Sequence, residues 1–240
     1  MDNFISNLAI DRELRNGFNC IKLGLVQFSR FNSSYQELFA PFLLLSVGIE
    51  RILKILYILN NYNINGEFPK KEELRNLGHK LDVLINIFVE TCSSYELYRI
   101  APARISDLDF LNNNSDFKEI IKILTHFSSE KGRYHNLNLL NDEELYWESP
   151  ENLNSRFLNQ KFENRKDIMD MINNPPYNTD MLYIEFNKIV ISSIQRFCRI
   201  LCFGFTQGAY GDLARQKSAF YVGEFLSIKD EDLHKINFKI

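Results

Sequence analysis

Proline and glycine are scarce in this sequence, whose 240 residues include six Pro and ten Gly. Both residues interrupt regular structure, and folds built from many short strands use them in their turns. Leu, Ile, Asn and Lys are abundant instead. This composition favours an all-α fold in which helices are joined by Asn-rich loops.

A strong charge of either sign is also lacking. The 28 basic and 31 acidic side chains leave a formal net charge of −3 at pH 7. This balance gives no overall field that would draw the chain to nucleic acid or to anionic lipid. Any site for a polyanion must therefore be a local patch.

Cysteine is rare, and the four cysteines are scattered along the chain: Cys20, Cys92, Cys198 and Cys202. Three of them fall in apolar helical runs, which is typical of buried free thiols in a reducing cytosol. Cys198 and Cys202 lie one helical turn apart, but no second Cys/His pair follows at zinc-finger spacing. We therefore expect no disulfide, no metal site and no cofactor.

No segment is apolar for long enough to span a bilayer. The most apolar run extends from Phe39 to Ile49 before Glu50 and Arg51 interrupt it, whereas a spanning helix needs about 20 apolar residues. The first residues, MDNFISNLAIDREL, are acidic where a signal peptide is basic. The sequence predicts a cytoplasmic protein with no membrane partner.

Apolar residues recur at helical spacing in five stretches. The expected helices cover approximately residues 10–31, 35–61, 71–94, 115–132 and 180–205. Between the last two, residues 141–179 are rich in Asn and Glu and contain two prolines, which predicts a largely irregular insertion with one short helix near Glu163–Ile172. Long loops in compact domains usually cover a site or a partner surface. We predict one all-α domain, residues 1–240, a single helical bundle of about five long helices with an irregular insertion.

The second and third expected helices carry a recognisable set of polar residues. They read GIERILKILYILNNYNINGEFPKKEELRNLGHKLDVLINIF over residues 48–88, with Glu50 and Lys54 one turn apart and His79 opening an HKL triplet. The stretch resembles the helical hairpin of the HEPN superfamily (higher eukaryotes and prokaryotes nucleotide-binding). In that family a helix with a Glu and a Lys precedes a helix that opens with His, a polar residue and Leu. Further on, Arg133 and Tyr134 are similar to an Arg–Tyr pair of some members, so the resemblance covers approximately residues 45–135.

The resemblance implies a bundle that often dimerises and that binds nucleotides or RNA. In many members it is a metal-independent ribonuclease of toxin–antitoxin or antiphage systems. The active members place a His several residues beyond an Arg. Arg75 and His79, and likewise Arg133 and His135, are closer together than in that pattern. The spacing of Arg and His in this chain therefore departs from that of the active members, and the ribonuclease that the resemblance implies would be a degenerate one.

Arg75 and His79 are four residues apart, so on one helix they would share a face. Metal-free RNA cleavage needs a base for the 2′-OH proton and a cation for the phosphorane, which His and Arg can supply. His79, Arg75 and Arg133 are therefore the candidate catalytic residues. The structural alternative puts Arg75 and His79 at the rim of the bundle, hydrogen-bonded to Glu50.

The remaining candidates are nucleotide-binding residues. Tyr134 and His135 flank the end of the fourth expected helix, where rings could stack on a base while Arg133 binds a phosphate. The alternative is a capping turn whose Tyr packs on a neighbour. Glu50 and Lys54 are candidates through the family-like pattern, or else form an ordinary ion pair.

Three functions follow as hypotheses from these residues. The first is a dimeric, nucleotide- or RNA-associated HEPN-like protein of a bacterial defence or toxin–antitoxin system. The second is a non-catalytic interaction or scaffold protein whose partner is encoded nearby and binds residues 141–179. The third is the helical partner of a separate nucleotidyltransferase.

Overall fold

The computed structural model describes residues 3–32, 38–96, 104–141, 148–174, 180–217 and 222–238. Within these ranges the regular structure is entirely helical, which confirms the predicted all-α bundle. Five helices have 14 residues or more, and each overlaps one of the five expected ranges: α1 (Asn3–Ser29), α2 (Phe39–Asn65), α4 (Leu81–Ser94), α7 (Ser115–Ser128) and α12 (Asp180–Gln207).

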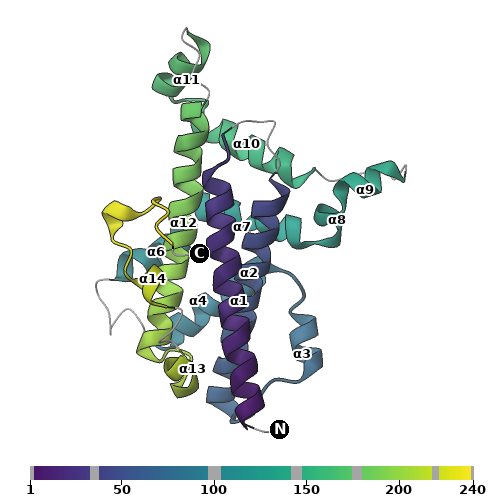
Figure 1. Ribbon diagram of the computed structural model, residues 1–240, viewed down its shortest axis with the longest axis vertical. Helices are drawn as coiled ribbons and strands as arrows, with labels where there is room; N and C mark the ends of the chain where they lie inside the picture. Colours follow the sequence, from purple (N-terminus) through teal and green to yellow (C-terminus); the bar gives the residue numbers. More distant parts are fainter. Residues whose placement is uncertain are drawn as a thin grey trace.

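Shorter helices join and extend these five, so the prediction of about five long helices does not match the described structure exactly. The longer of the short ones are α3 (Lys71–Asn76), α6 (Ile105–Asn113), α10 (Pro150–Phe162) and α11 (Lys166–Asn173). The others are α8 (Glu130–Arg133), α9 (His135–Leu140), α13 (Asp212–Lys217), α14 (Gly223–Leu226) and a 3-10 turn at Asp230–Asp232. In Figure 1, α1 and α2 lie side by side at the centre, α12 runs along them, and α8 and α9 project outward.

Glycines allow α1 and α2 to pack closely. A Cβ on Gly48 would lie 2.8 Å from the carbonyl oxygen of Gly17 and 2.9 Å from the backbone nitrogen of Ile21. A Cβ on Gly17 would collide with Ile52. A Cβ on Gly48 would also lie 2.7 Å from Cγ1 of Ile21, but the two backbone atoms cannot move aside as a side chain can, so any side chain at Gly48 would push the two helices apart. This close antiparallel pair forms the framework on which α2 presents its polar residues.

Helix α12 lies in the core of the bundle. Phe197 at its middle contacts Phe88 of α4 and Phe117 of α7, with ring centroids 5.7 and 5.8 Å apart. Among the described residues, α12 is the one helix with the length and hydropathy of a membrane span, and 72% of its most apolar window is buried inside the molecule. A largely buried apolar helix of this kind is typical of a protein core.

The free cysteines occupy the same interior. Cys92, Cys198 and Cys202 are buried, as predicted, whereas Cys20 is half-buried. Burial raises the pKa of the Cys92 thiol to about 12, and burial likewise raises the pKa values of Cys198 and Cys202. These thiols are therefore protonated at neutral pH and act as small apolar side chains.

A buried ion pair ties the C-terminal segment to α12. The Arg199 guanidinium donates to both carboxylate oxygens of Asp107 in α6, at 2.7 and 2.8 Å, and both side chains are almost fully buried. Arg199 also donates to the carbonyl oxygen of Ile228 and to Asp230, at 2.8 and 2.7 Å. One side chain thus joins α6, α12 and the segment after α14.

The third expected helix is not continuous, and this prediction is wrong. Helix α3 ends at Asn76, a turn follows, and α4 begins at Leu81. Gly78 lies in that turn with a φ of 58°, in the left-handed region that favours glycine. Arg75 and His79 therefore do not lie one turn apart on a common helical face.

The region from residue 141 to 179 also differs from the prediction of an irregular insertion. Ser149 caps α10 by accepting a hydrogen bond from the Asn152 backbone nitrogen at 3.0 Å, and Pro150 occupies the first turn. The buried residues of α10 include Leu153, Phe157, Leu158 and Phe162. This part of the chain is therefore a core element, and α11 takes the place of the short helix expected near Glu163–Ile172.

Candidate functional site

A pocket lined by both charged and apolar side chains lies where α1, α2, the α3–α4 turn and α8 meet. Its volume is ≈ 360 Å³, and six of its lining side chains are ionisable: Glu13, Glu50, Arg51, Lys54, His79 and Arg133. Three permanent cations here face two carboxylates, so the pocket is locally basic although the whole chain is slightly acidic. We call it the α2–α8 pocket.

The pocket contains a carboxylate–imidazole pair. His79 Nδ1 lies 2.9 Å from Glu50 Oε2 and 3.0 Å from Glu50 Oε1. A carboxylate accepts hydrogen bonds only, so Nδ1 must carry the proton in this contact. In the neutral imidazole, Nε2 is then left as a hydrogen-bond acceptor. Glu50 therefore fixes the tautomer of the ring.

The two members of this pair differ in exposure. The Glu50 side chain is 14% exposed, whereas the His79 side chain is 63% exposed. Glu50 lies on α2, deep in the pocket, and His79 projects from the turn that precedes α4. The carboxylate is thus held by the bundle while the ring faces solvent, where a ligand can reach it.

Lys54 shares the same carboxylate. Its Nζ donates to Glu50 Oε1 at 2.8 Å from the next turn of α2. The expected pair of Glu50 and Lys54 therefore forms, but it belongs to a three-residue cluster with His79. Because the Glu50 carboxylate accepts from the Lys54 ammonium, it offsets part of that charge and leaves a smaller net positive potential in the pocket.

Arg133 is the last residue of α8 and enters the pocket from there, although it is far in sequence from the pocket residues of α2 and of the α3–α4 turn. Its Nε is buried and has no hydrogen-bond partner in the described part of the chain. A buried charged donor without a partner costs free energy unless something binds it. This side chain is thus positioned to donate to a ligand that enters the α2–α8 pocket.

Glu13 and Arg51, two charged residues at one edge of the pocket, were not predicted. Arg51 of α2 donates to Glu13 of α1 in an ion pair between half-exposed side chains. The sequence shows that Glu50, Arg51 and Lys54 lie close together on α2. It does not show that Glu13 of α1 joins them, because that contact depends on the antiparallel packing of the two helices. Glu13 limits the pocket on that side.

Three candidate residues lie outside the pocket. Arg75 on α3 is exposed and its side chain makes no hydrogen bond or ion pair with the described residues. Tyr134 is 47% exposed on the outer side of the chain between α8 and α9. His135 lies beside it with Nδ1 3.4 Å from Asn136 Oδ1. The structure thus brings together Glu50, Lys54, His79 and Arg133, and leaves the other three apart.

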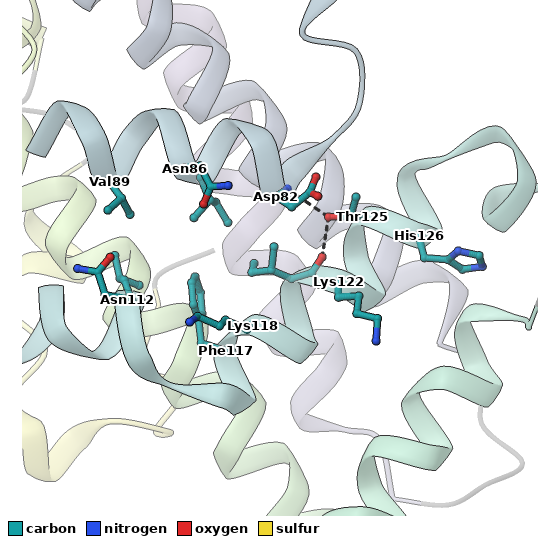
Figure 2. A pocket seen from close by; sticks show the side chains of 12 residues that line it. Asp82, Asn86, Val89, Asn112, Phe117, Lys118, Lys122, Thr125 and His126 are labelled. Carbon is teal, nitrogen blue, oxygen red and sulfur yellow. Dashed lines mark hydrogen bonds between the residues drawn. The ribbon is translucent and has the colours of Figure 1, made fainter.

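A larger hollow of ≈ 510 Å³ lies between α4, α6 and α7. Figure 2 shows Asp82 and Asn86 of α4 facing Lys118 and Lys122 of α7, with Phe117 at its base. The Asp82 backbone nitrogen donates to Thr125 Oγ1 at 3.3 Å, and Thr125 Oγ1 donates to the Ile121 carbonyl at 2.7 Å. His126 turns away from this hollow, and its Nε2 lies 2.8 Å from the Glu148 carbonyl oxygen.

The two hollows differ in their chemistry. In the larger one, Lys122 is paired with Glu119 on the same helix and the histidine ring points elsewhere. In the α2–α8 pocket, an oriented imidazole and an unpaired guanidinium nitrogen share one cavity. General acid–base chemistry on an anionic substrate needs an oriented imidazole beside a cation that can donate to the substrate. We therefore take the α2–α8 pocket as the candidate site.

Comparisons with known proteins give the chain no relative. No family model, no curated protein and no solved structure matches it. In the parts of the chain that are described, no group of three His, Cys, Asp or Glu side chains is arranged to hold a metal ion. The site is therefore interpreted from its own side chains.

Proposed function

We propose that the protein is a HEPN-like, RNA-associated protein and that its α2–α8 pocket cleaves RNA without a metal ion. The observation that carries this proposal is the convergence of His79, held by Glu50, with Arg133 in one cavity. Glu50 and Lys54 lie on α2, whereas His79 comes from the α3–α4 turn and Arg133 from α8, so three segments of the chain meet in this pocket. These four are also residues through which the sequence resembles the HEPN superfamily.

The chemistry assigned to the site is attack of a ribose 2′-oxygen on the adjacent phosphorus. His79 Nε2 takes the 2′-OH proton as general base. The phosphorane gains negative charge, which Arg133 and Lys54 stabilise by donating hydrogen bonds. The bond from phosphorus to the 5′-oxygen breaks, water protonates that oxygen, and a 2′,3′-cyclic phosphate remains.

The other walls of the pocket suit a nucleotide. Val47, Ile55 and Ile58 of α2 and Leu74 of α3 supply apolar surface beside the charged residues. A sugar or base can rest on such a surface while its phosphate faces the cations. The locally basic pocket compensates for the overall charge of the chain, which does not favour RNA.

The test is incubation of the purified protein with total tRNA in the presence of EDTA. We expect the wild-type chain to degrade tRNA and His79→Ala to leave it intact. Arg75→Ala is the matched control, because Arg75 is exposed and lies outside the pocket, and it should degrade tRNA as the wild type does. Intact tRNA with the wild-type protein would contradict the proposal.

The cellular part of the proposal is a role in bacterial defence or in a toxin–antitoxin pair, supported by the resemblance alone. Expression in a bacterial host tests it: the wild type should slow growth and His79→Ala should not. A scaffold protein, or a helical partner of a nucleotidyltransferase, would leave both growth and tRNA unaltered.

A further inference from the structure

The larger hollow, between α4, α6 and α7, takes no part in the proposed reaction, and we call it the α4–α7 hollow. Its volume of ≈ 510 Å³ is in the usual range for sites that bind small molecules. The apolar part of its lining consists of five side chains from the three helices: Ile85, Val89, Leu111, Phe117 and Ile121. All of them except Val89 are buried, so they form a floor rather than a projecting patch. A floor of this composition can receive the apolar body of a ligand.

Fixed contacts hold the hollow open at both ends. At one end the Asp82 backbone nitrogen donates to Thr125 Oγ1, which joins α4 to α7 (Figure 2). At the other end Asn114 caps α7 by accepting from the Phe117 backbone nitrogen at 2.8 Å. The Phe117 ring also packs on Phe110 of α6, with the ring centroids 5.7 Å apart. Because the walls are fixed in this way, a ligand can bind without the cost of ordering them.

The rim of the hollow on α7 carries positive charge. Lys118 and Lys122 lie one helical turn apart there, and both are exposed. The side chain of Lys118 makes no ion pair with the described residues, and Lys122 is 3.3 Å from Glu119 on its own helix. Asp82, the one carboxylate among the lining residues, lies in the first turn of α4, where the positive end of the helix offsets its charge. The rim therefore favours an anion.

The rim on α4 and α6 adds polar groups without adding charge. Asn86 of α4 and Asn112 of α6 are exposed, and each amide can donate or accept a hydrogen bond. Arginine is absent from the lining residues, so the hollow lacks the planar fork that binds phosphate through two parallel hydrogen bonds. A single compact negative group is the charge that two neighbouring ammonium groups fit best.

We propose that the α4–α7 hollow binds a small organic anion, an apolar ring system that carries one carboxylate. The carboxylate pairs with Lys118 and Lys122, and the rings cover the floor. No residue lines both this hollow and the α2–α8 pocket. The proposal is thus independent of RNA cleavage and holds whether or not the other pocket is catalytic.

Isothermal titration calorimetry with 2-naphthoate, and with the uncharged 2-naphthalenemethanol for comparison, tests the proposal. For the wild type we expect a Kd for naphthoate at least about tenfold lower than for the alcohol, because only the carboxylate pairs with the ammonium groups. This preference should shrink as NaCl rises from about 0.05 to about 0.5 M, since salt screens exposed charges. The double variant Lys118→Gln/Lys122→Gln should bind the two compounds with equal Kd values.

A second variant tests the place of binding. Asn86→Trp puts a large ring into the hollow from the exposed side of α4 and should raise the Kd for both compounds by about tenfold or more. Lys229→Gln is the matched control, because the Lys229 side chain is 72% exposed and lies outside the hollow. It should bind naphthoate as the wild type does.

Circular dichroism verifies that each variant is folded, which we expect because the substituted side chains are exposed. The proposal is overturned by a wild type that does not bind naphthoate, or that binds the alcohol equally tightly. A folded Asn86→Trp variant that binds naphthoate like the wild type overturns it as well.

Discussion

The imidazole Nδ1 of His79 lies 2.9 Å from Glu50 Oε2, although 29 residues separate the two in the chain. The mostly buried carboxylate on α2 orients an exposed ring on the α3–α4 turn. A ring oriented in this way can use Nε2 as a base, provided that the carboxylate stays ionised. The proposed activity depends on this pair.

Replacing Glu50 with Gln should lower the rate of RNA cleavage by about tenfold to hundredfold, the usual effect of losing the group that orients a functional histidine. The Gln side chain keeps the size of Glu, but its amide can donate as well as accept, so it no longer fixes the tautomer of the His79 ring. Single-turnover cleavage of a labelled oligoribonucleotide measures the rate. Glu13→Gln is the control, because Glu13 pairs with Arg51 and not with His79; a rate loss in that variant equal to the loss in Glu50→Gln would contradict the assignment.

The crossing of α1 and α2 should not tolerate a methyl group at Gly48. A Cβ there would lie 2.8 Å from the Gly17 carbonyl oxygen, so the backbones must separate. We expect Gly48→Ala to lower the free energy of unfolding by about 1–3 kcal/mol, as overpacking does elsewhere. Urea denaturation measures this change. Gly223→Ala is the control and should have little effect, because no atom lies within 4 Å of the added Cβ.

These elements show what periodicity could and could not predict. Helices α1, α2, α7 and α12 were predicted in position because their apolar residues recur without interruption. The turn after α3 was missed because the apolar pattern continues through it, although Gly78 adopts a positive φ that a helix does not allow. Helix α10 was missed because polar residues, many of them Asn, separate Leu153, Phe157 and Phe162.

The same limit applies to the site. The sequence suggested Glu50 and Lys54 as a pair and offered a hydrogen bond from His79 to Glu50 as the structural alternative, and the structure contains both contacts. The position of Arg133 in the same pocket depends on tertiary packing between α2, the α3–α4 turn and α8. The pairing of Arg75 with His79 depended on a helix that the turn interrupts. Spacing along the chain predicts neighbours on one element, and it carries no information about contacts between distant ones.

Replacing Arg199 with Met should destabilise the fold strongly. The substitution leaves buried Asp107 without its two closest hydrogen bonds, from Arg199 at 2.7 and 2.8 Å. Breaking a buried pair from one side costs about 3–5 kcal/mol in other proteins. Denaturation with urea measures the loss. Arg165→Met removes an exposed ion pair with Asp167 and should change the free energy of unfolding by less than about 1 kcal/mol.

The contact between Arg199 and Asp230 should make the anchoring of the C-terminal segment depend on pH. The hydrogen bond from Arg199 holds the pKa of Asp230 below its usual value. The folded state therefore favours the ionised carboxylate, and this contribution is present above the ordinary Asp pKa of about 4. It is lost as the pH falls through the lower pKa of the folded state.

We accordingly expect Asp230→Asn to be less stable than the wild type at neutral pH, and the difference to shrink as the pH falls below about 4. Unfolding free energies at several pH values test this. In an Arg199→Met background the same substitution should have no effect, because the partner is absent. A difference that persists unchanged in that background would show that Asp230 acts through another contact.

The proposed reaction requires that Arg133 and its neighbours in the α2–α8 pocket bind the phosphate of RNA. Fluorescence anisotropy with a labelled 2′-O-methyl oligoribonucleotide, which this reaction cannot cleave, measures that binding. Arg133→Gln removes a charged hydrogen-bond donor and should raise the Kd by about tenfold or more, whereas Arg75→Gln, outside the pocket, should leave the Kd unchanged. Wild-type protein that does not bind the oligonucleotide, or equal Kd values for wild type and Arg133→Gln, would contradict the account.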